Sequence, residues 1–257
     1  MNDSREPLPE AREICFPGSR HRWLLYHFST LDSTNDFLHR RTDSLPDRSV
    51  VTTDVQTAGR GRMGRSWISP PGGLYFSFLL SPGPSPDFAP RLGLLVADLV
   101  CDLLEESGIP GQVKWPNDVV VGGRKMAGIL PECGNHPQPW MIVGLGMNLA
   151  GIPGHTDSRG LVPSHWGAFS DAPEPMAILR DILGRLDASW PDRNLDPLQG
   201  RLASIGSRLW CRGQLVRMIR GPETFTGTVS GVAPDGCLIL ATSAGMKTFD
   251  SGELRPV

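Results

Sequence analysis

The sequence lacks any segment that would span a membrane, and it has no excess of charge of either sign. No apolar run in its 257 residues approaches the roughly 20 residues needed to cross a bilayer. The 25 basic and 27 acidic residues give a net charge of −2, so the chain has no global attraction for nucleic acid or for an anionic membrane. We therefore expect a soluble globular protein whose partners include neither DNA nor a membrane.

Cysteine and histidine are too scattered to suggest a disulfide framework or a metal site. The five cysteines are odd in number and contain no C-x-x-C pair. The six histidines show no ligand spacing. The first ten residues are polar and contain proline, unlike a secretory signal. These features predict a cytoplasmic protein with no metal site, and residues 1–20 are expected to form a flexible tail.

The most informative segment is the stretch TAGRGRMGR at residues 57–65. Arg60, Arg62 and Arg65 supply forked donors that fit carboxylate and phosphate oxygens, and the glycines let the backbone approach a ligand closely. The stretch also matches the Gly-x-Gly-x-x-Gly spacing of dinucleotide-binding proteins, but that pattern requires a helix to follow. The next residues, SWISPPGG, cannot sustain a helix. We therefore expect an anion site formed mainly by side chains.

Strand and helix patterns follow one another irregularly, which favours an α+β fold over a doubly wound one. A polar, proline-containing stretch at 191–197 separates a larger first part from a C-terminal part that resembles a small β-barrel. Helices are expected from the segment 32–36 through Leu38, from 92 to 107 and over 174–190. Strands are expected at 22–28, 49–56, 74–80, 112–115, 118–121, 125–132, 140–148, 209–211, 214–219, 224–232, 237–241 and 247–250.

A second group of polar residues lies on a predicted hairpin. The segment VKWPND at 113–118 is followed, after a Gly-Gly turn, by RKMAGIL at 124–130. Because the turn of a hairpin sets its register, Lys114 and Lys125 can reach one pocket. Asn117 and Asp118 add an amide and a carboxylate to the same place.

Five motifs, in this order along the chain, resemble the biotin protein ligase family. They are DSTN at 32–35, QTAGRGR at 56–62, KWPND at 114–118, KMAGI at 125–129 and GLGMNL at 144–149. The resemblance covers about residues 23–148, with the C-terminal barrel as weaker support. It implies a class II synthetase-like core, a mixed sheet flanked by helices, over residues 21–197, and an SH3-like β-barrel over 198–257.

The resemblance also implies an enzyme that activates biotin with ATP to biotinyl-5′-AMP. The biotinyl group would then pass to a lysine of a biotin carboxyl carrier protein, a subunit of acetyl-CoA carboxylase or a related carboxylase. Magnesium would be carried on the ATP phosphates rather than by a protein site.

The resemblance assigns roles to individual residues. Arg60 and Lys125 would hold the biotin carboxylate, and Arg62 the adenylate phosphate. Asp118 would orient or deprotonate the acceptor lysine, with Lys114 in the same catalytic group. The implied biotin site comprises Ser33, Thr34, Asn35, Gln56, Gly59, Arg60, Arg62, Lys125 and Gly128, and the implied adenylate site comprises Arg62, Arg65, Trp67, Asn117, Lys125 and Asn148.

Several of these residues also have a purely structural interpretation. Ser33 fits the N-cap of a helix, and Asp118 could simply satisfy backbone donors in its turn. Lys114 and Arg65 could be solvated surface charges. Trp115 is expected in the core, as large aromatic residues in strands usually are.

Two other functions stay open. A lipoyl or octanoyl ligase on a related scaffold would need a longer apolar slot, which the polar residues Ser33, Thr34 and Gln56 do not favour. A noncatalytic biotin-binding module would not need Lys125 and both central loop arginines, because biotin carries a single charge. About twenty residues precede the first predicted strand, too few for the DNA-binding helix-turn-helix of bifunctional members, so we expect a monofunctional ligase. A homodimer through an exposed sheet edge is a further alternative.

Overall fold

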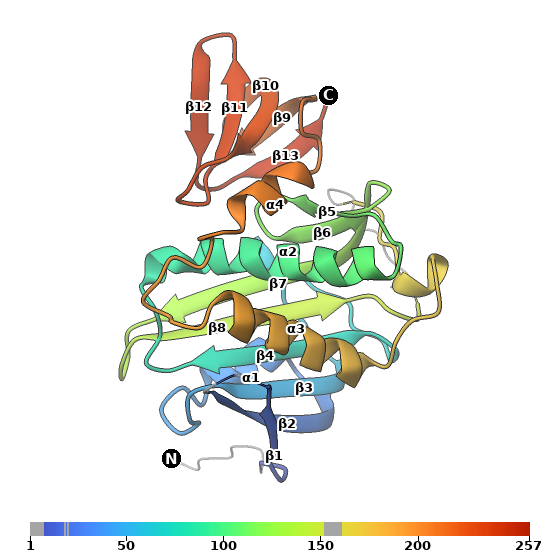
Figure 1. The fold of residues 1–257 in the computed structure, drawn as a ribbon, viewed down its shortest axis with the longest axis vertical. Helices are drawn as coiled ribbons and strands as arrows, with labels where there is room; N and C mark the ends of the chain where they lie inside the picture. The colour runs from blue at the N-terminus through green and yellow to red at the C-terminus, as the bar shows by residue number, and fades with distance from the viewer. Residues whose placement is uncertain (1–7, 18, 20, 152–160) are drawn as a thin grey trace.

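The computed structural model describes residues 8–17, 19, 21–151 and 161–257 (Figure 1). The larger part is a mixed eight-stranded sheet in the order β1-β2-β3-β4-β8-β7-β6-β5. A five-stranded antiparallel sheet, β12-β11-β10-β9-β13, follows it in the chain and lies near its β5–β6 end (Figure 1). This arrangement confirms the predicted α+β class, a mixed sheet with helices and a small SH3-like C-terminal domain.

The bounds of the elements follow the sequence patterns closely. Strands β2 and β3 run parallel, and the other neighbouring strands of the large sheet are antiparallel. The large sheet contains β1 (Arg12–Cys15), β2 (Arg22–Leu31), β3 (Ser49–Gln56), β4 (Leu74–Leu80), β5 (Gly111–Lys114), β6 (Asp118–Val121), β7 (Arg124–Gly134) and β8 (Trp140–Met147). The helices are α1 (Thr34–His39), α2 (Ala89–Glu106), α3 (Pro175–Ser189) and α4 (Leu202–Ser207), with short 3-10 helices η1 (Arg62–Gly64), η2 (Pro86–Phe88) and η3 (Trp166–Ala168). The small sheet contains β9 (Leu215–Arg220), β10 (Glu223–Val232), β11 (Leu238–Thr242), β12 (Gly245–Phe249) and β13 (Glu253–Pro256).

Helices cover both faces of the large sheet. Every residue of β4 is buried, and the strand has no polar alternation apart from Ser77, as expected for a strand that is covered on both sides. Phe76 and Phe78 belong to the core shared with α2 and α3, whereas Leu79 packs in a second core with Phe37 of α1. In Figure 1, α2 and α3 lie side by side across one face. The sheet is therefore a rigid support for the loops at its edge.

The structure corrects two expectations. Residues 12–15, which we expected in a flexible tail, form β1 and pair with β2, and Ile14 is buried. The sequence gives little signal for such a short strand, because the backbone of β2 provides its partners. The strand expected at 209–211 does not form: Leu209 makes one isolated bridge, and Cys211 adopts a left-handed φ of 59°. Residues 1–7, 18 and 20 of the expected tail lie outside the described residues.

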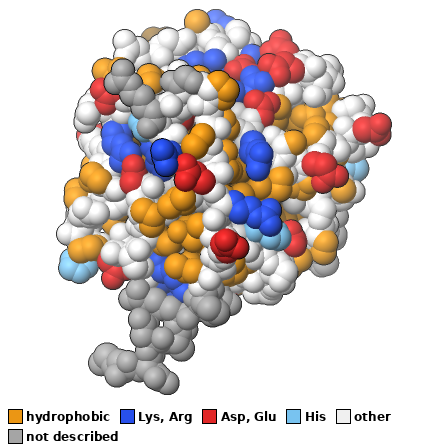
Figure 2. All heavy atoms as spheres, turned by 60° about the horizontal axis from the view of Figure 1, so that its bottom comes forward, with side chains coloured by type: hydrophobic (Ala, Val, Ile, Leu, Met, Phe, Trp, Pro, Cys, Tyr) orange, Lys and Arg blue, Asp and Glu red, His pale blue; other side chains and the backbone are white. Residues whose placement is uncertain are grey.

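The charge distribution on the surface and the conformation of the β6–β7 turn both match the sequence. Basic and acidic side chains are interspersed on the face shown in Figure 2, with hydrophobic side chains between them. The predicted turn between β6 and β7 uses Gly122 and Gly123, both with positive φ (56° and 74°), as a two-residue hairpin turn requires. In the described part of the chain, no helix is both long and apolar enough to cross a membrane.

An ionic cluster joins α4 to α2, and an indole hydrogen bond joins the large part to the small domain. Arg201 and Arg208, at the ends of α4, pair with Asp98 of α2 at 2.8 and 3.4 Å. Burial raises the pKa of Asp98, and the two arginines oppose this shift. Trp115 is buried, as predicted, and its Nε1 donates to the carbonyl oxygen of Gly236 in the small domain at 2.9 Å.

We expect Trp115→Phe to lower the free energy of unfolding because the carbonyl oxygen of Gly236 would lose its donor while staying buried. A lost partner of this kind costs about 1–3 kcal/mol. Trp23→Phe is the matched control: Trp23 is equally buried, but its Nε1 has no hydrogen-bond partner among the described residues. Urea unfolding of both variants measures the difference, and equal losses would contradict a role for this hydrogen bond.

Candidate functional site

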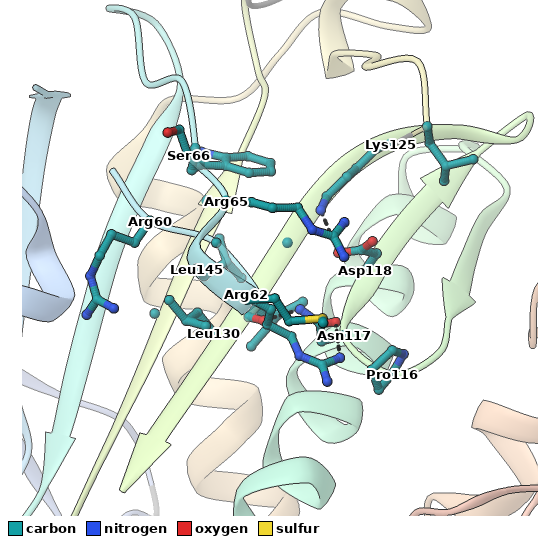
Figure 3. A pocket seen from close by; sticks show the side chains of 18 of the residues that line it. Arg60, Arg62, Arg65, Ser66, Pro116, Asn117, Asp118, Lys125, Leu130 and Leu145 are labelled. Atoms are coloured by element: carbon teal, nitrogen blue, oxygen red, sulfur yellow. Dashed lines mark hydrogen bonds and ion pairs between the residues drawn. The ribbon is translucent and has the colours of Figure 1, made fainter. Parts of the chain in front are cut away.

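A pocket of about 510 Å³ lies where the loop after β3, the start of α1, the β6–β7 hairpin and the last strand of the small sheet meet (Figure 3). The structure brings nearly all of the predicted site residues into its lining. These are Ser33, Thr34, Asn35, Gln56, Arg60, Arg62, Arg65, Trp67, Lys114, Asn117, Asp118, Lys125, Gly128 and Asn148. Gly59 does not line the pocket.

Gly59 acts behind the pocket wall. Its carbonyl oxygen accepts from the backbone N–H of Trp67 at 2.8 Å. A Cβ atom at this position would lie 2.4 Å from the carbonyl oxygen of Trp67 and 2.9 Å from Nε2 of Gln56. Only glycine fits here, because the two sides of the loop approach too closely for a side chain. This steric requirement explains the glycine in the motif, and no contact with a ligand is needed to explain it.

One part of the pocket is lined by neutral polar side chains from α1 and β3. The Oε1 atom of Gln56 accepts from the backbone N–H of Thr34 at 2.9 Å, and its Nε2 donates to Ser69 at 2.8 Å. Ser33 caps α1, as predicted, and accepts from the backbone N–H of Asp36 at 3.3 Å. Ser33 also lines the pocket, so its capping role does not exclude a contact with a ligand.

The other end of the pocket is cationic and is organised around Asp118. Lys125 lies 2.6 Å and Lys114 lies 3.7 Å from its carboxylate oxygens. Both lysines are mostly buried, so Lys114 is not the solvated surface charge of the structural interpretation. Asp118 pairs with these lysines, and the interpretation that it only satisfies backbone donors does not account for its position.

These contacts set the ionisation of the cluster. Burial acts to raise the pKa of Asp118, but Lys125 and Lys114 outweigh it, and the pKa lies below the ordinary value of 3.8. Burial lowers the pKa of Lys114, and Asp118 partly opposes that shift. Asp118 is therefore an ionised acceptor at neutral pH.

The arginine loop extends over the cationic end. Arg62 donates to Oδ1 of Asn117 at 3.0 Å, and Asn117 is held in turn by a bond to the carbonyl oxygen of Ile129. Burial lowers the pKa of Arg62. Arg65 points toward Lys125 and Asp118 in Figure 3 and also lies 3.7 Å from Glu253 of β13. Residues 65–85, all of them described, contain no helix, so the dinucleotide-binding interpretation is excluded.

Arg60 lies apart from the other cations of the pocket (Figure 3). Its guanidinium pairs with Asp36 at 2.6 Å and with Glu132 at 3.0 Å. Burial acts to lower the pKa of Arg60, but the hydrogen bonds to these two carboxylates outweigh it and raise the pKa. Arg60 and Lys125 thus have different carboxylate partners in this structure. That both bind the carboxylate of one substrate stays a prediction.

Trp67 lines the pocket next to Lys125. Its ring lies 5.1 Å from the ammonium nitrogen of Lys125, a cation–π contact. A Cβ atom at Gly146 would lie 2.3 Å from Nε1 of Trp67, and one at Gly128 would lie 3.2 Å from Nζ of Lys125. Bare backbone at these two positions therefore leaves room for the indole and the lysine. Asn148 is buried nearby and donates to the carbonyl oxygen of Ser164 at 2.9 Å.

Sequence reasoning missed three acidic residues of the site. Glu132 lies two residues beyond Leu130 on β7, and an acid on the pocket side of an apolar strand is a signal that could have been used. Asp36 lies in the first turn of the predicted helix, where an acidic residue is expected on helical grounds alone. Glu253 comes from the small domain, and no local pattern in the sequence links it to the arginine loop.

Comparison with known proteins agrees with this geometry. The model of the "Biotin/lipoate A/B protein ligase family" matches residues 27–148, and the "Biotin protein ligase C terminal domain" matches residues 213–254. The biotin-(acetyl-CoA-carboxylase) ligase of Paracoccus denitrificans is 32% identical over 236 residues, covering 87% of this chain and 96% of that protein. The chain belongs to the biotin protein ligase family.

This ligase is also similar to a second sequence relative and to a solved structure. The "Bifunctional ligase/repressor BirA" of Bacillus subtilis is 30% identical over 246 residues, which cover 90% of this chain and 73% of that protein. The solved structure of the biotin protein ligase from Aquifex aeolicus in complex with biotin and ATP has a TM-score of 0.73 and 28% identity, covering 91% of this chain and 99% of the other. The protein is thus an enzyme of the ligase class.

The charges in the pocket suit a ligase that must bring two anions together. Five cations line the pocket, namely Arg60, Arg62, Arg65, Lys114 and Lys125, against the two carboxylates of Asp118 and Glu253. Two like charges 4 Å apart repel by about 4 kcal/mol at an effective dielectric constant of about 20, and nearby cations offset such a repulsion.

In the described part of the chain, no three His, Cys, Asp or Glu side chains are grouped as a metal site.

We expect Asp118→Asn to lower the free energy of unfolding at neutral pH by about 1.5–3 kcal/mol, because two buried lysines lose their counter-charge. The pKa of Asp118 is lowered in the folded protein, so its stabilisation is complete above the ordinary value of 3.8 and is lost as pH falls through the folded value. Urea unfolding of both proteins over a pH series should show the difference shrinking below that value. A difference independent of pH would rule out this ionisation.

Proposed function

We propose that this protein activates biotin with ATP to biotinyl-5′-AMP and transfers the biotinyl group to a specific lysine of a biotin carboxyl carrier protein. The observation that carries the proposal is one pocket lined both by neutral hydrogen-bonding groups around Gln56 and by a cationic cluster around Asp118. Biotin has a neutral ureido head and an anionic valerate tail, so it is complementary to both ends.

The neutral end would bind the ureido ring. Hydroxyl and amide groups line this part of the pocket, from Ser33, Thr34, Asn35 and Gln56. Gln56 is fixed by its bonds to Thr34 and Ser69, so its pocket-facing groups are preorganised. A lipoyl or octanoyl chain would leave these polar groups unpaired, which argues against the alternative substrates.

The cationic end would bring the reacting groups together. An oxygen of the biotin carboxylate attacks the α-phosphorus of ATP, the bond to the β-phosphate oxygen breaks, and pyrophosphate leaves. Lys125 and Arg62 are proposed to offset the repulsion between the two anions. Arg60 is assigned to the same carboxylate, for which it would have to leave Asp36 and Glu132. Magnesium would enter on the ATP phosphates.

The transfer step requires a neutral amine on the carrier lysine. We assign Asp118 to this step, as the group that orients the amine or accepts its proton, because it is ionised and lies 2.6 Å from Lys125. The amine nitrogen then attacks the acyl carbon, and AMP leaves with the electrons of the acyl–phosphate bond. Lys114 would hold Asp118 in place from the other side.

We also propose a cytoplasmic location for this chemistry. All five cysteines, Cys15, Cys101, Cys133, Cys211 and Cys237, are free thiols. A reducing compartment would keep them so.

Substrate activation tests the proposal most directly. Purified protein with ATP and biotin should release pyrophosphate, and lipoate in place of biotin should release little. Addition of a biotin carboxyl carrier domain should then yield one biotinylated lysine per domain, detected by mass spectrometry. Pyrophosphate release with lipoate alone would favour the lipoyl alternative, and biotin binding without any release would favour a noncatalytic binding module.

We expect Arg62→Gly to weaken binding of biotinyl-5′-AMP by about 1.5–3 kcal/mol, the value of a charge-assisted hydrogen bond, and so to release the intermediate before transfer. Free adenylate in the medium, separated from the protein by filtration, measures this loss. Arg124→Gly is the control, since Arg124 is exposed on the nearby hairpin and does not line the pocket. Retention equal to that of the unmodified protein would remove Arg62 from its assigned role.

A further inference from the structure

A chain of polar groups runs from the neutral end of the pocket into the large sheet. Ser77 of β4 is fully buried and does not line the pocket. Its Oγ atom lies 2.7 Å from Oγ1 of Thr34 and 2.6 Å from Oδ1 of Asn35. The amide nitrogen of Asn35 donates to Glu132 at 2.7 Å and to the carbonyl oxygen of Leu130 at 3.2 Å. A pocket residue is thus connected to a carboxylate through a serine that no ligand can reach.

The protons of this chain can be placed by elimination. Carboxylate and carbonyl oxygens only accept, so Asn35 must turn its NH₂ group toward Glu132 and Leu130 and its oxygen toward Ser77. The amide oxygen also only accepts, so the one hydroxyl proton of Ser77 goes to Asn35. The 2.7 Å contact between Ser77 and Thr34 must then use the proton of Thr34, because otherwise two lone pairs would face each other.

The hydroxyl group of Thr34 is left without a proton for a ligand. Its other neighbour, Oε1 of Gln56, is farther away at 3.2 Å and already accepts from the backbone N–H of Thr34. Thr34 can therefore only accept a hydrogen bond from a molecule in the pocket. A donor such as N–H fits there, and an acceptor at the same point would meet a second lone pair.

We propose that Ser77 is a positioning residue that sets the head-group specificity of this ligase. By accepting the hydrogen bond of the Thr34 hydroxyl, Ser77 leaves Thr34 as an acceptor for one ureido N–H of biotin. Gly144 of β8 makes room for this chain, since a Cβ atom there would lie 2.1 Å from Oδ1 of Asn35. The inference rests on the proposed function, because it requires the head of biotin to lie against Thr34.

The test compares biotin with two cyclic carbamates, each of which has a ring oxygen in place of one ureido N–H. The unmodified protein should disfavour the carbamate whose oxygen meets Thr34. In Ser77→Ala, the hydroxyl of Thr34 no longer donates to Ser77 and can donate to that oxygen instead. For each protein, the kcat/KM for biotin is divided by the kcat/KM for this carbamate, both measured by pyrophosphate release. We expect this ratio to be about tenfold lower in Ser77→Ala than in the unmodified protein. The difference should lie in KM rather than in kcat. The ratio for the other carbamate should stay the same.

Two further variants control the experiment. Ser49→Ala removes an equally buried hydroxyl on β3, which donates to the carbonyl oxygen of Pro46 and has no contact with Thr34. Its ratios should equal those of the unmodified protein. Ser77→Cys keeps a side chain of similar size that is a weaker donor and acceptor, so it should give an intermediate ratio. This variant decides the question if thermal unfolding shows that Ser77→Ala does not fold.

The outcomes separate this inference from the proposed function. Unchanged ratios in a folded Ser77 variant, or an equal loss with all three substrates, would overturn the role of Ser77. If the unmodified protein releases no pyrophosphate with biotin, the proposed function itself fails. A fall in one ratio only, absent from Ser49→Ala, is the result that supports the inference.

Discussion

The site depends on keeping several cations close together before any substrate arrives. Lys114 and Lys125 converge on Asp118, whose single charge compensates two ammonium groups in a largely buried place. A substrate anion that enters this cluster meets groups that are already desolvated and positioned, so little reorganisation is needed at the moment of reaction. Asp118 is therefore both the structural centre of the cationic end and the group assigned to the transfer step.

The large sheet makes this arrangement possible because it is packed on both faces. Lys114, Asp118 and Lys125 lie on the consecutive antiparallel strands β5, β6 and β7 of that sheet, and β7 is paired in turn with β8. The arginine loop, in contrast, is held by a few bonds around Gly59 and by side chains such as Asn117. Rigid strands thus carry the lysines, and a glycine-rich segment carries the arginines. The first set can stay in place while the second rearranges around a bound anion.

Much of the fold and most of the pocket could be predicted from the sequence, since both depend on local patterns. Strands such as β3 and β4 were predicted at their observed bounds because apolar runs end at turn residues. The motif residues come together because two turns set the register of β5, β6 and β7. The partners of Arg60, the contribution of Glu253 and the chain through Ser77 depend on contacts between segments far apart in sequence. No periodicity reports such contacts, and for the same reason β1 was missed.

The contribution of β13 to the pocket has a consequence for how the enzyme is made. Gly252, Glu253 and Leu254 line the pocket together with residues of the larger part of the chain. A nascent chain that has emerged only as far as α4 already carries every lysine and arginine of the pocket but not these three residues. The first part can begin to fold on the ribosome, whereas the binding site is finished only after synthesis reaches the last strand. A chain interrupted before β13 would thus carry the same cations without this part of the lining.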